Sequence, residues 1–148
     1  MSDITAETLP KLVESLLPEF GDAREINPLS GGNINHVWRI FNKKDESIIA
    51  KHAPPYIASN PDVPLSRSRI RFEAEALKQF QTGGELEHVT NNSFRPPHIL
   101  AFNEQYSLLL MEDVGTFTEL NNVQLSSQIA GSIGQRLGAF IGNLHRTT

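Results

Sequence analysis

The sequence predicts an α+β fold: a five-stranded, mostly antiparallel sheet with one helix packed on it and further helices near both ends. Three observations lead to this prediction. Five short segments have β-type composition, and turn signals separate most of them. Three other segments repeat apolar residues every three or four positions, as amphipathic helices do. The successive strands are joined mainly by short turns, which favours antiparallel pairing.

The N-terminal part of the chain predicts one helix and three strands. The helix has one apolar stripe, and Pro18 and Gly21 end it; the stripe consists of Leu9, Leu12, Val13, Leu16, Leu17 and Phe20. The three strands lie at residues 24–30, 34–41 and 47–52, with turns between them. We therefore assign residues 1–22 to an N-terminal helix and residues 23–115 to the main lobe.

The rest of the chain predicts two helices and two strands. Four prolines between residues 54 and 64 indicate an extended connection, and a helix begins after it near Ser66 or Ser68. A polar surface loop follows over residues 81–97. Two strands lie at residues 98–102 and 106–111. Residues 116–148 form a linker and a last helix that has an apolar face.

Composition excludes several classes of protein. The chain has 148 residues, a formal net charge of −4 and no cysteine, so disulfides, thiolate metal sites and cysteine nucleophiles are excluded. A membrane span needs about 20 consecutive apolar residues, and no such run or secretory signal is present. We therefore expect a cytoplasmic protein without a membrane or nucleic-acid partner. The five histidines lack paired spacing and predict no metal site.

The last helix carries four glycines on one narrow stripe: Gly131, Gly134, Gly138 and Gly142. Each glycine costs roughly 1 kcal/mol of helix propensity relative to alanine. The stripe lies about a third of a turn from the centre of the apolar face, at about 100° per residue. A surface without side chains lets another backbone approach closely, so the stripe predicts either a docking face for a further helix or a frayed helix end.

The order of the polar motifs indicates nucleotide chemistry. A glycine turn, Ser30-Gly31-Gly32-Asn33, separates the first two strands, where its backbone can lie against phosphates. Lys51 ends the third strand and can supply a fixed cation. A carboxylate on the following helix, either Glu73 or Glu75, can hold that lysine in line. This order is the one expected of a kinase-type nucleotide-binding lobe.

These segments resemble methylthioribose kinases and the wider aminoglycoside phosphotransferase family, which have the protein kinase-like fold. Residues 30–38 are similar to the glycine loop of methylthioribose kinases, although Ser30-Gly31-Gly32 departs from its usual pattern. Residues 49–57, 64–65 and 69–77 resemble the family's third strand, connection and helix. Residues 106–113 resemble the strand that leads to its hinge, and Leu137-Gly138 with Leu144-His145 resembles the helix that opens its second lobe. The resemblance implies that this chain is the N-terminal lobe of a kinase, and that residues 116–148 are a linker and the first helix of a second lobe that is missing from it.

The resemblance also implies a role for each phosphate-side residue. Lys51 would contact the α- and β-phosphates of ATP, and Glu73 would pair with Lys51. Glu75 lies about 200° further around the helix and would face away. The phosphates would be covered by Gly31, Gly32 and Asn33.

On the adenine side, the resemblance places Met111 at the back of the pocket, with the Glu112 carbonyl and the Val114 amide at the adenine edge. After Asp113, the chain has no aspartate, and Glu119 is its only acidic residue. Phosphoryl transfer needs an aspartate near the acceptor hydroxyl and further carboxylates on magnesium. We therefore expect no catalytic residue in this chain, and we expect Mg²⁺ binding only with a second lobe.

Two hypotheses follow. In the first, the chain is the ATP-binding lobe of a kinase that transfers phosphate to a sugar-type hydroxyl of a small-molecule acceptor, and the lobe is inactive alone. In the second, the chain is a non-catalytic interaction module with a kinase-like lobe. That module would dock a partner through the glycine-striped last helix, by self-association or by binding a second lobe.

Overall fold

The computed structural model of the chain describes residues 4–30, 32–90, 94–116 and 127–147, with side chains from residue 131 onward in the last range. Two compact units are present. The first consists of residues 1–77 and 97–113, and the second consists of residues 78–96 and 114–148. Within the described ranges, no helix combines the length and the apolarity needed to cross a membrane.

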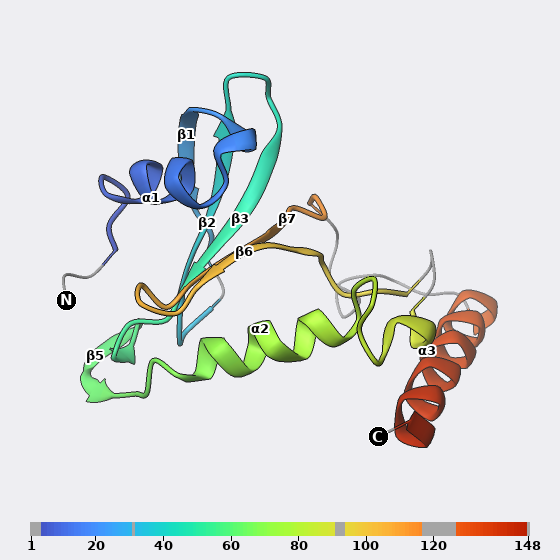
Figure 1. Cartoon of the computed structure of the whole chain (residues 1–148). Helices are drawn as coiled ribbons and strands as arrows, with labels where there is room; N and C mark the ends of the chain where they lie inside the picture. The colour runs from blue at the N-terminus through green and yellow to red at the C-terminus, as the bar shows by residue number, and fades with distance from the viewer. Residues whose placement is uncertain (1–3, 31, 91–93, 117–126, 148) are drawn as a thin grey trace. The chain divides into compact units, whose positions relative to one another are not determined.

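The first unit contains a five-stranded antiparallel sheet (Figure 1). In chain order, its strands are β1 (Ala23–Pro28), β2 (His36–Asn42), β3 (Ser47–His52), β6 (Ile99–Asn103) and β7 (Leu108–Glu112). They lie in the order β1, β2, β3, β7, β6, and every neighbouring pair is antiparallel. The predicted α+β fold with five strands is therefore confirmed. It is the architecture expected of a kinase N-terminal lobe.

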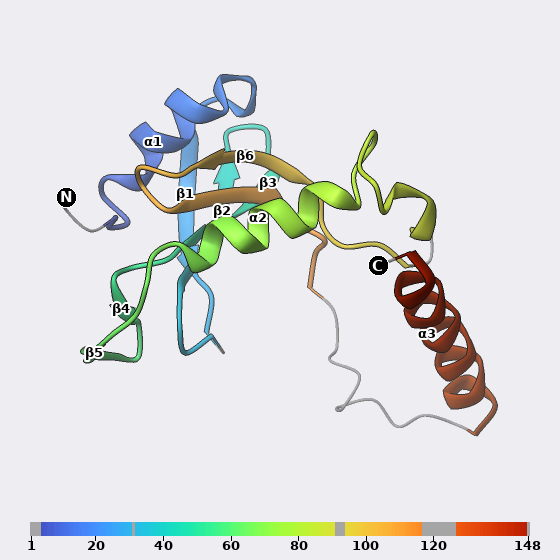
Figure 2. The same ribbon diagram turned by 60° about the horizontal axis from the view of Figure 1, so that its bottom comes forward.

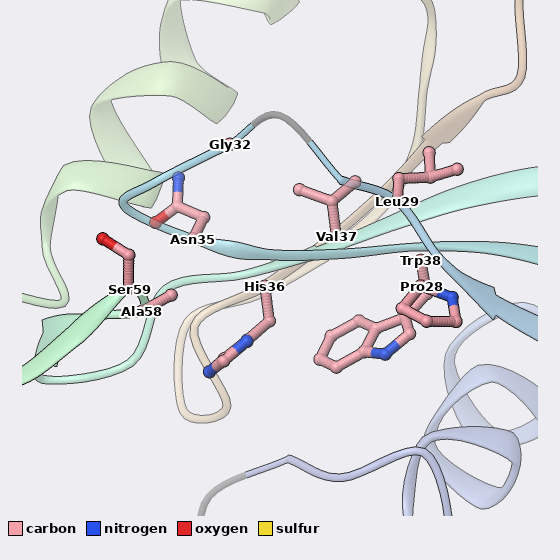
Figure 3. Close-up of a pocket in the computed structure, with 9 residues that line it drawn as sticks. All are labelled: Pro28, Leu29, Gly32, Asn35, His36, Val37, Trp38, Ala58 and Ser59. Carbon is pink, nitrogen blue, oxygen red and sulfur yellow. The ribbon is translucent and has the colours of Figure 1, made fainter.

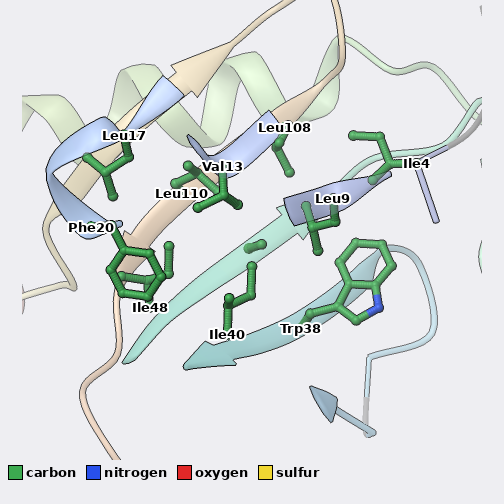
Figure 4. Close-up of a cluster of buried hydrophobic side chains, with 11 residues drawn as sticks. Ile4, Leu9, Val13, Leu17, Phe20, Trp38, Ile40, Ile48, Leu108 and Leu110 are labelled. Atoms are coloured by element: carbon green, nitrogen blue, oxygen red, sulfur yellow. The ribbon is translucent and has the colours of Figure 1, made fainter. Parts of the chain in front are cut away.

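One face of the sheet packs against the N-terminal helix, as Figure 4 shows. The helix α1 spans Leu9–Leu16, and a 3₁₀ turn, η1, follows at Pro18–Phe20. The predicted helix therefore stops earlier than residue 20, because Pro18 has no N–H to continue the helical hydrogen bonds. Burying a large apolar side chain contributes about 1.5–3 kcal/mol. The buried cluster on this face consists of Ile4, Leu9, Val13, Leu17, Phe20, Trp38, Ile40, Ile48, Ala50, Leu108 and Leu110.

The other face of the sheet packs against α2, which spans Arg69–Gln79 and begins directly after Ser68. Figure 2 shows α1 and α2 on opposite sides of the sheet. The second buried cluster consists of Ala53, Ile70, Ala74, Leu109 and Met111. Ile49 packs against this cluster, whereas its neighbour Ile48 belongs to the α1 side. Successive side chains of β3 therefore alternate between two apolar layers.

A second, two-stranded sheet occupies the connection between β3 and α2. It consists of β4 (Tyr56–Ile57) and β5 (Asn60–Pro64), which pair antiparallel. The sequence predicted only an extended connection here. All five residues of β5 are exposed, so the segment has no apolar alternation. Its prolines also count against a strand, because proline has no N–H for a ladder hydrogen bond.

The second unit contains α3 (Ser127–Thr147) and the short 3₁₀ turn η2 (Glu87–Val89). Phe140 of α3 lies against Phe80 and Phe94, with ring centroids 6.2 and 5.4 Å apart. These contacts join α3 to the polar connection that follows α2. The described part of that connection otherwise has irregular structure, as its glycines and prolines predicted.

His52, at the end of β3, is buried with one ring nitrogen unsatisfied. The residue is 1% exposed, and its Nδ1 lies 3.0 Å from the backbone carbonyl of Tyr106. Because a carbonyl can only accept, Nδ1 carries the proton, and Nε2 has no hydrogen-bond partner among the described residues. Burial is the main reason that the pKa of His52 is lowered, and the nearby Arg67 and His36 lower it further.

We predict that the free energy of unfolding falls as the medium becomes acidic and that His52→Asn reduces this dependence. The unfolded histidine takes up a proton near pH 6.5, whereas the buried ring resists charging, so lower pH favours the unfolded state. Each unit between the two pKa values corresponds to about 1.4 kcal/mol. Urea denaturation at about pH 7 and about pH 5 measures the effect. An equal loss in the wild type, His52→Asn and the control His145→Asn, which replaces an exposed histidine, contradicts the prediction.

Candidate functional site

The strand register places Lys51 near the middle of the sheet, on the face that carries α2. Its cross-strand partners are Val37 on β2 and Leu109 on β7. The adjacent row on the same face pairs Ile49 with Met111. Because cross-strand partners point to the same side of a sheet, the Lys51 side chain lies among apolar neighbours.

Lys51 forms an ion pair with Glu73 of α2. The distance from Lys51 Nζ to Glu73 Oε1 is 2.7 Å, and the two side chains are 24% and 34% exposed. Glu75, the other carboxylate considered in the sequence, lies 3.5 Å from Arg71 on its own helix. The structure therefore brings Glu73, and not Glu75, to the lysine. Partial burial makes such a pair costly to break from one side.

The glycine turn joins β1 to β2, the strand that pairs with the Lys51 strand. The N–H of Leu29 donates to the carbonyl of Val37 at 2.8 Å, which closes the base of the turn. Gly32 and Asn33 are exposed on the turn, whereas Gly31 lies outside the described residues. Val37 is also the strand partner of Lys51. The backbone at the base of the turn and the backbone of Lys51 therefore share Val37 as a neighbour.

A cavity of about 180 Å³ borders this turn (Figure 3). The side chains of His36 and Trp38 lie on the opposite side of β2 from Val37. Neither Lys51 nor Glu73 lines the cavity, so it is separate from the surface around the ion pair. The sequence did not indicate it, because it forms only where the β4–β5 hairpin meets the turn. Its lining consists of Pro28, Leu29, Gly32, Asn35, His36, Val37, Trp38, Ala58 and Ser59.

The predicted adenine-side residues lie at the end of β7. Met111 is 8% exposed and belongs to the buried cluster under α2. The N–H of Glu112 donates to the carbonyl of His98 at 2.8 Å, and its carboxylate accepts from the N–H of His98 at 3.1 Å. Val114 follows shortly after and is 46% exposed. The strand therefore ends in the buried Met111, and exposure then rises through the half-buried Glu112 and Asp113 to the exposed Val114.

Asp113 forms a buried polar cluster that the sequence did not predict. Its side chain is 4% exposed, and Arg39 of β2 contacts both carboxylate oxygens, with Nε 2.6 Å from Oδ2 and Nη2 3.1 Å from Oδ1. Ser47 at the start of β3 donates its hydroxyl to Oδ2 at 2.8 Å. Two-point contact between arginine and a carboxylate is geometrically specific. The cluster fixes the point at which the chain leaves β7.

Comparison with known proteins relates the chain to kinases in general. It is 32% identical over 129 residues to a 4-hydroxytryptamine kinase of Psilocybe cyanescens. The matched region covers 81% of this chain and 36% of that protein. It is 29% identical over 133 residues to a 4-hydroxytryptamine kinase of Psilocybe cubensis. This second match covers 84% of the chain and 37% of that protein. The chain thus spans slightly more than a third of the length of these curated relatives. No protein-family profile matches it.

We predict that Asp113→Asn lowers the free energy of unfolding by about 2 kcal/mol, because it removes the charged partner of a partly buried Arg39. Asp45→Asn is a matched control. Asp45 pairs with Arg24, but these side chains are 73% and 47% exposed, so its loss should have an effect of about 0–1 kcal/mol. Denaturant unfolding at neutral pH measures both variants. Equal effects contradict the assignment of a structural role to Asp113.

Proposed function

We propose that this chain is the ATP-binding lobe of a small-molecule kinase. The ion pair between Lys51 and Glu73 carries the proposal, because it holds an amine on the central strand of the sheet, next to the strand that follows the glycine turn. Kinases use a lysine held by a helix carboxylate to position the phosphates of ATP. The similarity to two proteins named as kinases supports the same function.

On the phosphate side, Lys51 contacts the α- and β-phosphates in this proposal, and Glu73 holds its amine in place. Gly31, Gly32 and Asn33 lie over the phosphates. Glycine has no side chain, so the backbone N–H groups of such a turn can approach phosphate oxygens closely. The exposure of Gly32 and Asn33 leaves this part of the turn accessible to a ligand.

On the adenine side, we propose that the base lies on the apolar surface next to Lys51. Met111 forms the back of the pocket. The carbonyl of Glu112 accepts from the adenine amino group, and the N–H of Val114 donates to the ring. The Asp113 cluster supports this arrangement, because it holds the backbone between these two groups at a fixed exit from the sheet.

We propose that the catalytic aspartate and the ligands of Mg²⁺ belong to a second lobe of the full-length protein. Phosphoryl transfer needs both, and Glu119 is the only acidic residue of this chain after Asp113. The relatives extend well beyond the matched region, which supports a second lobe. This chain alone then binds ATP without transferring phosphate.

The absence of cysteine supports a reducing, cytoplasmic setting.

The acceptor in this proposal is a small molecule with a hydroxyl group. Both relatives are named for a hydroxytryptamine, whereas the resemblance seen in the sequence points to a sugar-type hydroxyl. Either acceptor would take the γ-phosphoryl group of ATP on its hydroxyl oxygen. Assays of the full-length protein with both classes of acceptor decide between them.

We predict that Lys51→Met lowers the affinity for ATP at least about tenfold, equivalent to about 1.4 kcal/mol, while adenosine affinity changes little. Methionine keeps an apolar stem of similar length and removes the charge, so the variant loses the attraction to phosphate only. Calorimetric titration of the 148-residue chain with ATP and with adenosine measures both affinities.

Two further variants sharpen this test. Glu73→Gln should cause a smaller loss of ATP affinity, because the amine remains but loses its charged partner. Glu75→Gln is the matched control, since Glu75 lies on the same helix and pairs with Arg71. A folded wild-type chain that binds no nucleotide refutes the proposed function. An equal loss of affinity in Glu75→Gln refutes the role of the ion pair.

A second candidate function, which is compatible with the first, is that of a non-catalytic interaction module, and the surface of α3 favours it. Leu137 and Ile141 are 37% and 41% exposed. Outside the adjoining backbone of α3 itself, a Cβ atom added at any of the four striped glycines would meet no described atom within 4 Å. A closely packed partner offsets the helix-propensity cost of such glycines. We propose that the partner is the second lobe of the full-length protein, because the relatives continue beyond the matched region.

We predict that Gly138→Leu has opposite effects on the 148-residue chain and on the full-length protein. In the chain, the open space at Gly138 accepts a side chain, and helix propensity adds up to about 1 kcal/mol to the stability. In the full-length protein, the added bulk blocks close approach and costs about 1–3 kcal/mol. Thermal unfolding of both measures the effects, with Ser132→Leu on another face as the control. Stabilisation of both proteins contradicts docking at this stripe.

A further inference from the structure

We propose that Arg69 and the β4–β5 hairpin hold the end of the glycine turn in the shape that receives a triphosphate. Arg69 is then a positioning residue for phosphate binding. This inference rests on the proposed function, because it concerns the turn that would cover the phosphates of ATP. Two sets of hydrogen bonds carry it, and they meet at the carbonyl of Ile34.

The Arg69 guanidinium connects three segments of the lobe. It lies at the first residue of α2 and donates to the end of the glycine turn, to β4 and to the residues that precede the helix. An arginine side chain has five N–H groups, and the structure provides five acceptors within 2.5–3.5 Å. These acceptors are Asn35 Oδ1 and the backbone carbonyls of Ile34, Tyr56, Leu65 and Ser66.

Because all five N–H groups of Arg69 already have acceptors within the lobe, we do not expect Arg69 to bind phosphate directly. Nε donates to Asn35, and each of the two terminal nitrogens donates to two carbonyls. A direct contact with phosphate would therefore require one of these bonds to break. The side chain therefore acts on phosphate binding through the turn that it holds.

The tip of the β4–β5 hairpin makes the second set of bonds. The N–H of Ala58 donates to the carbonyl of Ile34 at 3.2 Å, and the N–H of Ser59 donates to the carbonyl of Asn33 at 3.0 Å. Asn33 is one of the residues proposed to cover the phosphates. The carbonyl of Ile34 accepts from both Ala58 and Arg69. The hairpin and the arginine therefore hold the same short segment.

Anchoring the end of the turn reduces the entropic cost of binding phosphate. Fixing the backbone of one residue costs about 1–2 kcal/mol at room temperature, and glycine residues lose the most freedom. A turn whose last residues are already fixed has fewer residues to order around a ligand, which is the general benefit of preorganisation. Adenosine has no phosphate to order the turn, so its affinity is independent of this anchor.

Arg69→Lys tests the proposal. Lysine keeps the charge, but its donors radiate from one atom and cannot replace a planar fork that spans three segments. We expect the affinity of the 148-residue chain for ATP to fall about tenfold and its affinity for adenosine to stay within about twofold. Arg71→Lys is the matched control, because Arg71 lies on the same helix and contacts Glu75 and Glu104. It should leave both affinities within about twofold.

Hydrogen exchange in the absence of nucleotide measures how firmly Arg69 and the hairpin hold the end of the turn. Exchange of the Ala58 and Ser59 amides, followed by NMR, reports directly on the bonds between the hairpin and the turn. Both amides should exchange faster in Arg69→Lys than in the wild type or in Arg71→Lys. Asn35→Ala removes a single acceptor of Arg69 and should give a smaller increase. It keeps the proposal testable if Arg69→Lys does not fold.

Unchanged exchange in Arg69→Lys and Asn35→Ala overturns the proposal. Parallel losses of ATP and adenosine affinity also overturn it, because they would show a general effect on the fold. A wild-type chain that binds neither ligand refutes the proposed function instead. In that case, the exchange of Ala58 and Ser59 still decides whether Arg69 holds the turn.

Discussion

The alternation of side chains along β3 is the constraint on which the rest of the structure depends. Ile48 and Ala50 point into the buried cluster under α1, and Ile49 and Lys51 point to the side of α2. A shift of one residue would place the Lys51 amine in the α1 cluster, where no described carboxylate belongs. Burying an unpaired amine is costly. Apolar packing therefore sets the register, and the register sets the position of the lysine.

The candidate site combines this rigid centre with anchored edges. Glu73 reaches Lys51 because α2 packs on the same face through its own apolar residues. At one edge, Arg39 and Ser47 hold Asp113 where the chain leaves β7. At another edge, Arg69 and the hairpin hold the end of the glycine turn. Binding groups on a fold need such supporting contacts, because small displacements weaken a ligand site.

In the proposed function, the lobe would supply positioning and electrostatic attraction for a nucleotide, whereas the groups that move protons and hold metal ions would come from elsewhere in the kinase. The distribution of acidic residues agrees with this division, since Glu119 is the only one after Asp113. The exposed glycine stripe of α3 agrees with it as well, because it is a surface suited to close packing. The relatives are much longer than the matched region, and the additional length is enough for a second lobe.

The sequence by itself determined the five strands of the main sheet, the three helices and the order of the glycine turn, lysine and helix carboxylates. These features depend on local apolar periodicity and on turn residues, which a single sequence displays directly. Only the tertiary structure decided the β4–β5 hairpin, the Asp113 cluster and the contacts of Arg69. Arg39 and Asp113 are 74 residues apart, and Arg69 and Asn35 are 34 apart. Such polar pairs produce no repeating pattern in the sequence, because their partners are far apart in the chain and are brought together by the packing of the apolar layers.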